Sequence, residues 1–178
     1  MADEEGASPK EQLIESCRRN NTSLLNDVLS SSPFSSNPDA IAKFLNTTTD
    51  ALGSSALHVA AQYGSYEVLD VILDQEGVEI DGQERRDGDT CLHRAVRYSN
   101  SLDKADWEHG KAVVDILVDA GCDARIRNNA KLKPIDLVDP RNTELRSDLQ
   151  KAELTLQMSN DLVEEDDEGP DGPGSESD

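Results

Sequence analysis

The sequence contains an internal repeat, which narrows the possible folds more than any other feature. The stretch Gly53–Tyr63 (GSSALHVAAQY) aligns without a gap with Gly88–Tyr98 (GDTCLHRAVRY), at an offset of 35 residues. Leu57-His58 and Leu92-His93 therefore occupy the same place in the two copies. Self-similarity at a period of about 20 to 50 residues is typical of proteins built from stacked repeats.

A second apolar run follows each copy, at 68–73 (VLDVIL) and at 113–118 (VVDILV). These runs are 45 residues apart, so about ten residues (45 − 35) are inserted in the second copy, within 99–109. Each copy thus predicts two short helices joined by a turn.

Weaker copies flank these two. A third begins near Asn128, with 133–138 (KPIDLV) in the place of the first helix and a second helix predicted over 142–158. Upstream, 11–20 and 23–30 predict a short helix pair, and Asn37-Pro38-Asp39 predicts the start of one more short helix. Because a single unit buries too little apolar surface to be stable alone, the units are expected to stack into one all-α solenoid.

These residues resemble the ankyrin repeat, whose pattern opens with Gly-x-Thr-Pro-Leu-His-x-Ala-Ala. The matches are Gly53-Ser-Ser-Ala-Leu-His-Val-Ala-Ala61 and Gly88-Asp-Thr-Cys-Leu-His-Arg-Ala-Val96, and Lys133-Pro-Ile-Asp-Leu-Val138 is a form common in closing repeats. The resemblance implies helix-turn-helix units with short β-hairpin loops, about four repeats with degenerate caps. It also implies that His58 and His93 form hydrogen bonds between successive repeats. The layout is similar to that of small fungal ankyrin proteins with an acidic carboxyl-terminal tail.

The expected domain organisation has disordered ends around one repeat domain. Residues 161–178 carry nine acidic and no basic side chains, a composition that favours disorder. The expected segments are a disordered 1–9, an ankyrin-repeat domain over 10–158 and a disordered acidic tail over 159–178. Within the domain we expect a degenerate cap (10–49), a repeat (50–85), a repeat with the insert 99–109 (86–127), and a closing repeat with a capping helix (128–158).

Charge and composition limit the partners. With 37 acidic against 17 basic residues, the formal net charge is −20, which argues against direct binding of nucleic acid or of anionic membrane surfaces. No apolar run approaches the roughly 20 residues that cross a bilayer, and the polar start of the chain does not resemble a targeting signal. The sequence therefore predicts a monomer in the cytoplasm, the nucleus or both.

Catalytic, cofactor and metal sites are not expected. Cys17, Cys91 and Cys122 lack the close spacing of a zinc or redox site and are interpreted as small buried hydrophobic residues. His109 is interpreted as a surface residue. The sequence contains no nucleophile elbow, phosphate loop or zinc-protease motif.

The resemblance implies that partners bind on the concave side, at the hairpin tips and on the exposed face of each first helix. Tyr63 and Tyr98 fall on equivalent positions, and Trp107 lies in the neighbouring insert. Tyrosine, tryptophan and arginine are enriched at binding hot spots, although both tyrosines could instead pack on the neighbouring helix. The candidate partner-binding residues are Ala51, Leu52, Ser54, Gln62, Tyr63, Arg86, Asp87, Asp89, Arg97, Tyr98, Trp107, Asn129, Ala130 and Leu132.

Three functions remain open at this point. The first is a protein–protein interaction module that holds a partner segment on the concave surface. The second is an escort of a very basic client, such as a ribosomal protein or histone, attracted by the negative charge. The third is an inhibitory or adaptor subunit of an enzyme. The acidic tail could also serve solubility alone.

Overall fold

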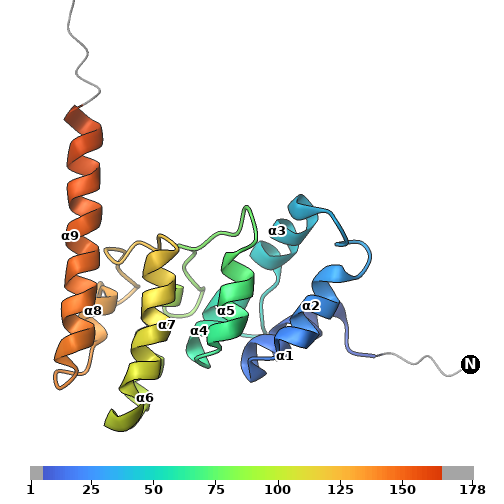
Figure 1. Cartoon of the computed structure of the whole chain (residues 1–178), viewed down its shortest axis with the longest axis horizontal. Coiled ribbons are helices and arrows are strands. Elements are labelled where there is room, and N and C mark those ends of the chain that lie inside the picture. Colours follow the sequence, from blue (N-terminus) through green and yellow to red (C-terminus); the bar gives the residue numbers. More distant parts are fainter. Residues whose placement is uncertain (1–5, 166–178) are drawn as a thin grey trace, which may run out of the picture.

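A computed structural model describes residues 6–165, and this part of the chain is helical (Figure 1). The α-helices are α1 (Pro9–Arg19), α2 (Thr22–Ser30), α3 (Pro38–Thr47), α4 (Ala56–Gln62), α5 (Tyr66–Leu73), α6 (Cys91–Ser101), α7 (Trp107–Asp119), α8 (Pro134–Leu137) and α9 (Thr143–Glu165), with a 3₁₀ turn, η1 (Lys104–Asp106), before α7. None of the helices in this range is long and apolar enough to cross a membrane.

The helices form four antiparallel pairs that stack side by side, which confirms the predicted solenoid (Figure 1). The first helices α1, α4, α6 and α8 pack on one another in order, and α2, α5 and α7 form the outer row. The fourth pair closes the stack, with Lys111 of α7 held 3.1 Å from Asp148 of α9. Only α3 lies outside this scheme, where Asn46 bonds the backbone of Gly77 and Glu79 after α5.

Local sequence explains where the helices begin. Ser8 caps α1 by accepting a hydrogen bond from Glu11 N–H, the Glu11 carboxylate accepts in return from Ser8 N–H, and Pro9 occupies the first turn. α3 begins where predicted: the Asn37 side chain accepts a hydrogen bond from Ala40 N–H, and Pro38 occupies the first turn. Thr90 caps α6, and the His93 side chain bonds back to the Thr90 backbone.

The core is a single apolar cluster that runs through all four pairs. Leu, Val, Ile and Ala dominate it, and the two phenylalanines stack at 4.3 Å beside α3. Leu117 of α7 is fully buried between the helices. Cys17, Cys91 and Cys122 are buried free thiols, as interpreted from the sequence. Burial raises the pKa of the Cys17 thiol to about 12, which keeps it protonated and unreactive.

The hairpin loops are simpler than expected. In the described residues, strand pairing is limited to one isolated bridge between Thr49 and Ser55. Each loop is nevertheless closed by one backbone hydrogen bond of 2.9 Å. These bonds run from Asp50 N–H to the Ser54 carbonyl, from Glu84 N–H to the Asp89 carbonyl, and from Asn128 N–H to the Leu132 carbonyl. We call 50–54, 84–89 and 128–132 the first, second and third tips.

The insert 99–109 is part of the helices rather than a surface loop. It lengthens α6 to Ser101 and forms η1 and the first turn of α7. Gly110 allows this arrangement because its backbone lies against Ser99, where an added Cβ would be only 2.5 Å from the Ser99 hydroxyl oxygen. Asn100, at the end of α6, bonds the backbone of Leu137 and Asp139 and so joins the insert to the last repeat.

Two expected boundaries are wrong. The tail was expected to be disordered from residue 159, but α9 continues to Glu165. Its sequence contains neither glycine nor proline before Gly169, so acidic composition alone did not end the helix. At the other end, Pro9 belongs to α1 and not to a disordered segment. The disorder expected for 1–5 and 166–178 lies outside the described residues.

Candidate partner-binding surface

The three tips share one device that fixes their shape. Asp50 Oδ1 accepts hydrogen bonds from Leu52 N–H and Ser54 N–H, both at 2.9 Å. Asn128 Oδ1 accepts the equivalent pair, from Ala130 N–H and Leu132 N–H, both at 3.0 Å. Such bonds let a short polar side chain hold a turn without a β-ladder.

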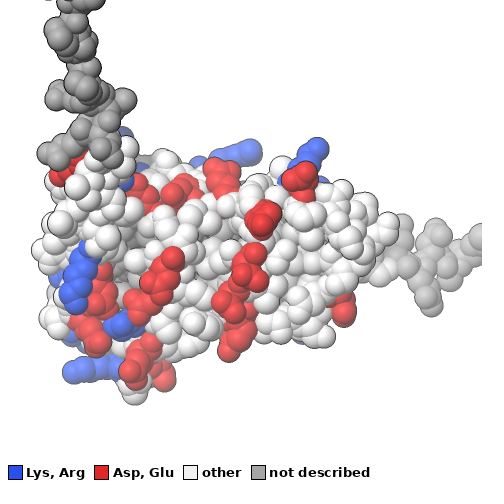
Figure 2. Space-filling model, turned by 45° about the horizontal axis from the view of Figure 1, so that its top comes forward, with Lys and Arg blue, Asp and Glu red and all other residues white. Residues whose placement is uncertain are grey.

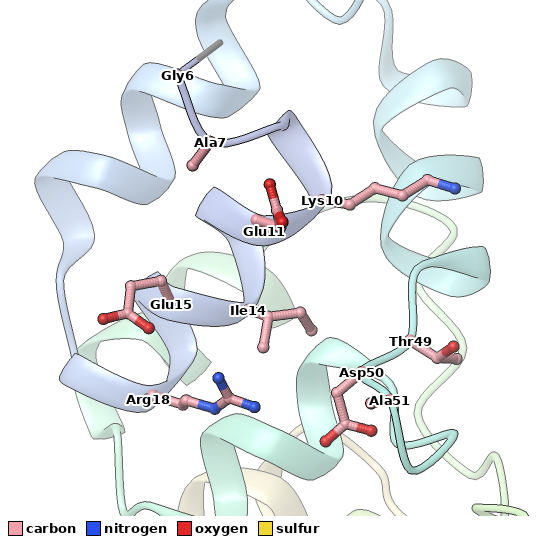
Figure 3. Close-up of a pocket in the computed structure, with 10 residues that line it drawn as sticks. All are labelled: Gly6, Ala7, Lys10, Glu11, Ile14, Glu15, Arg18, Thr49, Asp50 and Ala51. Atoms are coloured by element: carbon pink, nitrogen blue, oxygen red, sulfur yellow. The ribbon is translucent and has the colours of Figure 1, made fainter.

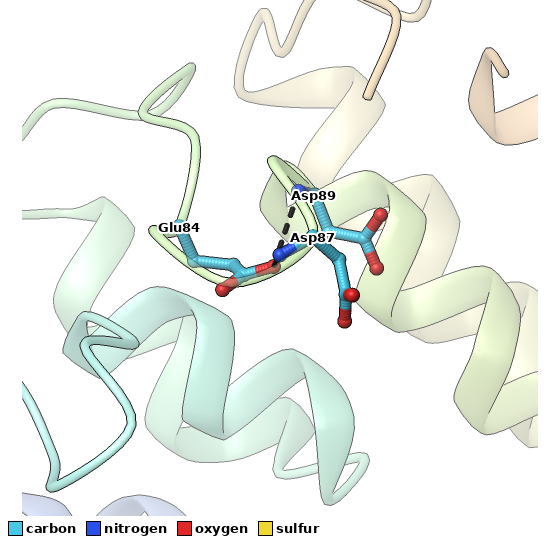
Figure 4. Close-up of side chains that lie close together, drawn as sticks. All are labelled: Glu84, Asp87 and Asp89. Carbon is cyan, nitrogen blue, oxygen red and sulfur yellow. Dashed lines mark hydrogen bonds between the residues drawn. The ribbon is translucent and has the colours of Figure 1, made fainter. Parts of the chain in front are cut away.

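Glu84 has the same role in the second tip, which is one residue longer. Its carboxylate accepts from Asp87 N–H at 2.7 Å and from Asp89 N–H at 3.3 Å (Figure 4), and also from Arg86 N–H at 2.7 Å. Burial alone would raise the pKa of Glu84, but these bonds and the Arg94 charge outweigh it and lower the pKa. Sequence reasoning missed all three capping residues; the available signal was an acceptor side chain shortly before each repeat motif.

His58 and His93 connect each repeat to the next, as the resemblance implied. His58 Nε2 donates to the Asp89 carbonyl at 2.9 Å, and its Nδ1 lies 2.7 Å from the Ser55 hydroxyl. His93 repeats this with the Leu132 carbonyl at 2.8 Å and the Thr90 hydroxyl at 2.8 Å. Burial lowers the pKa of both imidazoles, so both are neutral at pH 7.

Two of the candidate residues are buried and cannot meet a partner directly. Asp89 is fully buried; its carboxylate accepts from Arg97 Nε at 2.8 Å and from Asn128 Nδ2 at 2.9 Å. Burial alone would raise the pKa of Asp89, but these two bonds and the Arg97 charge lower it. Ser54 is 3% exposed because the first tip folds over it. Both expectations are corrected: these side chains support the tips from beneath.

Most of the other candidates lie in the open. Leu52, Tyr63 and Leu132 are 62%, 49% and 37% exposed. Two hydrogen bonds join the second and third tips: the Asn129 backbone N–H donates to the Asp87 carbonyl at 2.9 Å, and the Asn129 side-chain Nδ2 donates to the Arg86 carbonyl. The remaining exposed candidates are Ala51, Gln62, Arg86, Asp87, Arg97, Asn129 and Ala130. We call the open side of α1, α4 and α6, together with the tips, the inner surface.

Tyr98 and Trp107, unlike Tyr63, are half-buried. The Tyr98 ring lies against Gly64, where an added Cβ would overlap it, and meets the His109 ring edge-on at 5.8 Å. Gly64 also has a φ of +64°, so glycine is required there on two grounds. Trp107 is half-buried at the start of α7, with the Arg141 guanidinium 5.9 Å from its ring centroid. Packing explains Tyr98, and Trp107 lies where α7 meets the start of α9. His109 is exposed, as interpreted from the sequence.

A hollow of about 740 Å³ extends the inner surface toward the amino end (Figure 3). It lies between α1 and the first tip. Figure 3 shows Ile14 and Arg18 projecting from successive turns of α1 toward the turn that carries Asp50 and Ala51, while Lys10 extends above that turn. The hollow is open and mixed in polarity, which suits a peptide side chain better than an enclosed small molecule.

Among residues 6–165, Glu84, Asp87 and Asp89 of the second tip form a group that could offer three carboxylate ligands to a metal ion (Figure 4). Their carboxylates already serve the fold. Arg94 lies 3.3 to 3.7 Å from all three, and the Glu84 carboxylate caps the tip. The arrangement is an ion-pair network that stiffens the second tip.

Comparison with known proteins agrees with this architecture. The family model of ankyrin repeats (three copies) matches residues 13–128, from α1 into the third tip. The chain is also 44% identical over 174 residues to the ankyrin repeat-containing protein YGL242C of Saccharomyces cerevisiae, covering 95% of this chain and 93% of the yeast protein. The chain therefore belongs to the ankyrin-repeat family, whose members generally act as protein-interaction modules without enzymatic activity.

Proposed function

We propose that this chain is a non-enzymatic binding module that holds a segment of a partner protein on its inner surface. The observation that carries the proposal is the placement of Leu52, Tyr63 and Leu132. Leu52 and Leu132 are exposed on the first and third tips, and Tyr63 is exposed at the carboxyl end of α4. Large exposed apolar side chains within a polar rim are typical of protein interaction sites.

The tips are also stiff before a partner arrives. Each is closed by a backbone bond and capped by a buried or half-buried side chain, and His58 and His93 fix the second and third tips to the preceding helices. Because these loops are already ordered, little conformational entropy is lost when a partner binds. A larger share of the contact energy then contributes to affinity.

Affinity purification from cell extract with quantitative mass spectrometry tests the proposal. The test variant is Leu52→Asp with Tyr63→Ala. The matched control is Leu154→Asp with Met158→Asp, which changes two residues of similar exposure (54% and 66%) on α9, away from the tips. Proteins retained by the unchanged chain and by the control, but lost with the test variant, are expected. Partners that survive the test variant and are lost with the control would instead assign binding to α9.

A second candidate, the escort of a basic client, is favoured by the outer helices. The exposed positions of α5 are Glu67 and Asp70, and α7 exposes Glu108 and Asp119. Figure 2 shows acidic groups scattered across this face. A basic client would bind there or along the acidic tail. The same purification separates the two functions, because an escorted client would be strongly basic and would survive Leu52→Asp with Tyr63→Ala.

A further inference from the structure

The exposed charged side chains at the second and third tips are mainly basic, although the molecule as a whole is acidic. The chain as a whole carries −20, and the outer helices follow that balance. The second and third tips and their flanks instead present four exposed basic side chains, Arg85, Arg86, Arg127 and Lys131. We call these four residues the basic edge.

The fold brings the basic edge together from two repeats. The Asn129 backbone N–H bonds the Asp87 carbonyl beside Arg86, and Gln83 Nε2 donates to the Arg127 carbonyl at 2.8 Å. Gly88 makes this close approach possible: it has a φ of +68°, and an added Cβ there would lie 2.8 Å from Asn129 Cγ. The basic residues therefore stand on one hydrogen-bonded platform.

The acidic residues of the same region are neutralised or turned inward. The side chains of Glu84 and Asp89 are fully buried. Glu84 forms an ion pair with Arg94, and Asp89 forms one with Arg97. Asp123 is held by both Nε and Nη2 of Arg125 at 2.9 Å. Asp87 is the exposed exception, and it lies 3.7 Å from Arg94. Among the described side chains, no ion pair engages any of the four residues of the basic edge.

We propose that the basic edge binds an acidic segment of the partner protein, and this inference rests on the proposed function. Arginine presents a planar fork of donors that matches a carboxylate, which favours Asp or Glu side chains as its ligands. Leu52 and Leu132 lie beside the platform and offer apolar contact to residues between the acids. The segment is short because the remaining surface is acidic and repels a long polyanion.

A random library of peptides of about 15 residues, displayed on phage and selected on the immobilised full chain, tests the inference. The best peptide is then labelled and measured by fluorescence anisotropy. The test variant is Arg86→Glu with Lys131→Glu, whose side chains bond nothing in the described structure. The matched control is Lys43→Glu with Arg146→Glu, the same change of charge at exposed sites on α3 and α9.

We expect selected peptides to be rich in Asp and Glu. The test variant should weaken the best peptide about tenfold or more, and the control by less than about threefold. Raising NaCl from about 50 to about 500 mM should weaken the peptide on the unchanged chain.

Other outcomes overturn the inference and separate it from the proposed function. If selected peptides are neutral or basic and are lost with Leu52→Asp and Tyr63→Ala, the acidic partner is wrong and the inner surface still binds. If the affinity of the best peptide is unchanged by every inner-surface variant, both proposals fail. Binding of a labelled dT15 oligonucleotide as tightly as the best peptide would assign the edge to nucleic acid. If acidic peptides bind only after residues 166–178 are changed from acids to amides, the chain's own tail occupies the edge.

Discussion

One buried or half-buried polar residue in each tip decides the geometry of this surface. Asp50, Glu84 and Asn128 differ in chemistry, yet each offers an acceptor oxygen to the backbone of its own tip. His58 and His93 then join the second and third tips to the preceding helices. The three tips therefore share the same hydrogen bonds, although the residues that form them differ in type.

The histidines predict a pH dependence of stability. Nε2 of each donates to a carbonyl and Nδ1 faces a hydroxyl, so the neutral ring fits and burial lowers the pKa. The unfolded chain binds protons near the ordinary value of 6.5, whereas the folded chain binds them only at lower pH. The free energy of unfolding should therefore fall as the pH drops below about 6.5, until the folded pKa is passed.

Urea unfolding between about pH 7.5 and pH 5 measures this effect. His58→Gln with His93→Gln keeps a donor and an acceptor at each site but cannot titrate in this range. The double variant should be less stable at pH 7.5, and its stability should fall less on acidification. Equal falls for both proteins would show that the two histidines do not link folding to protons.

At the scale of elements, the repeat pattern predicted the helix pairs because periodic apolar residues and motif spacing are local. Leu57-His58 and Leu92-His93 do occupy equivalent places, on α4 and α6. What failed depended on neighbours. Asp89 is buried against Asn128 of the next repeat, and Tyr98 is covered by Gly64 and His109. The insert extends α6 because Gly110 lets α7 approach. No single-repeat pattern contains these contacts.

α9 packs against the stack with one face only. Leu145 and Leu149 on that face are fully buried, while Leu154 on the opposite face is 54% exposed. Leu149→Ala should lower the free energy of unfolding by about 2 to 5 kcal/mol, since it leaves a cavity in the closing repeat. Leu154→Ala should change it by less than about 0.5 kcal/mol. Urea titration followed by circular dichroism measures both; similar losses would mean that α9 does not dock as described.

At the scale of the whole molecule, acidic and basic side chains lie on different parts of the stack. The outer helices carry acidic side chains, whereas the basic groups of the tips lie where neighbouring repeats meet. A stack of repeats allows this division because each unit contributes one helix to each side. The excess of negative charge nevertheless acts on the fold itself, because like charges held near one another oppose compaction.

Self-repulsion of this kind predicts that salt stabilises the protein. The chain carries a net charge of −20 on 178 residues, so its charges repel one another overall. The attraction within the eleven ion pairs of the described residues does not outweigh this repulsion, because exposed pairs contribute little each. The melting temperature should therefore rise between about 10 and about 300 mM NaCl, as the screening length shortens to a few ångströms. Changing the six acids of 166–178 to amides reduces the net charge to −14 (−20 + 6) and should make that rise smaller. A melting temperature that falls with salt in both proteins would mean that attractive pairs, and not the acidic excess, dominate the electrostatics of the folded chain.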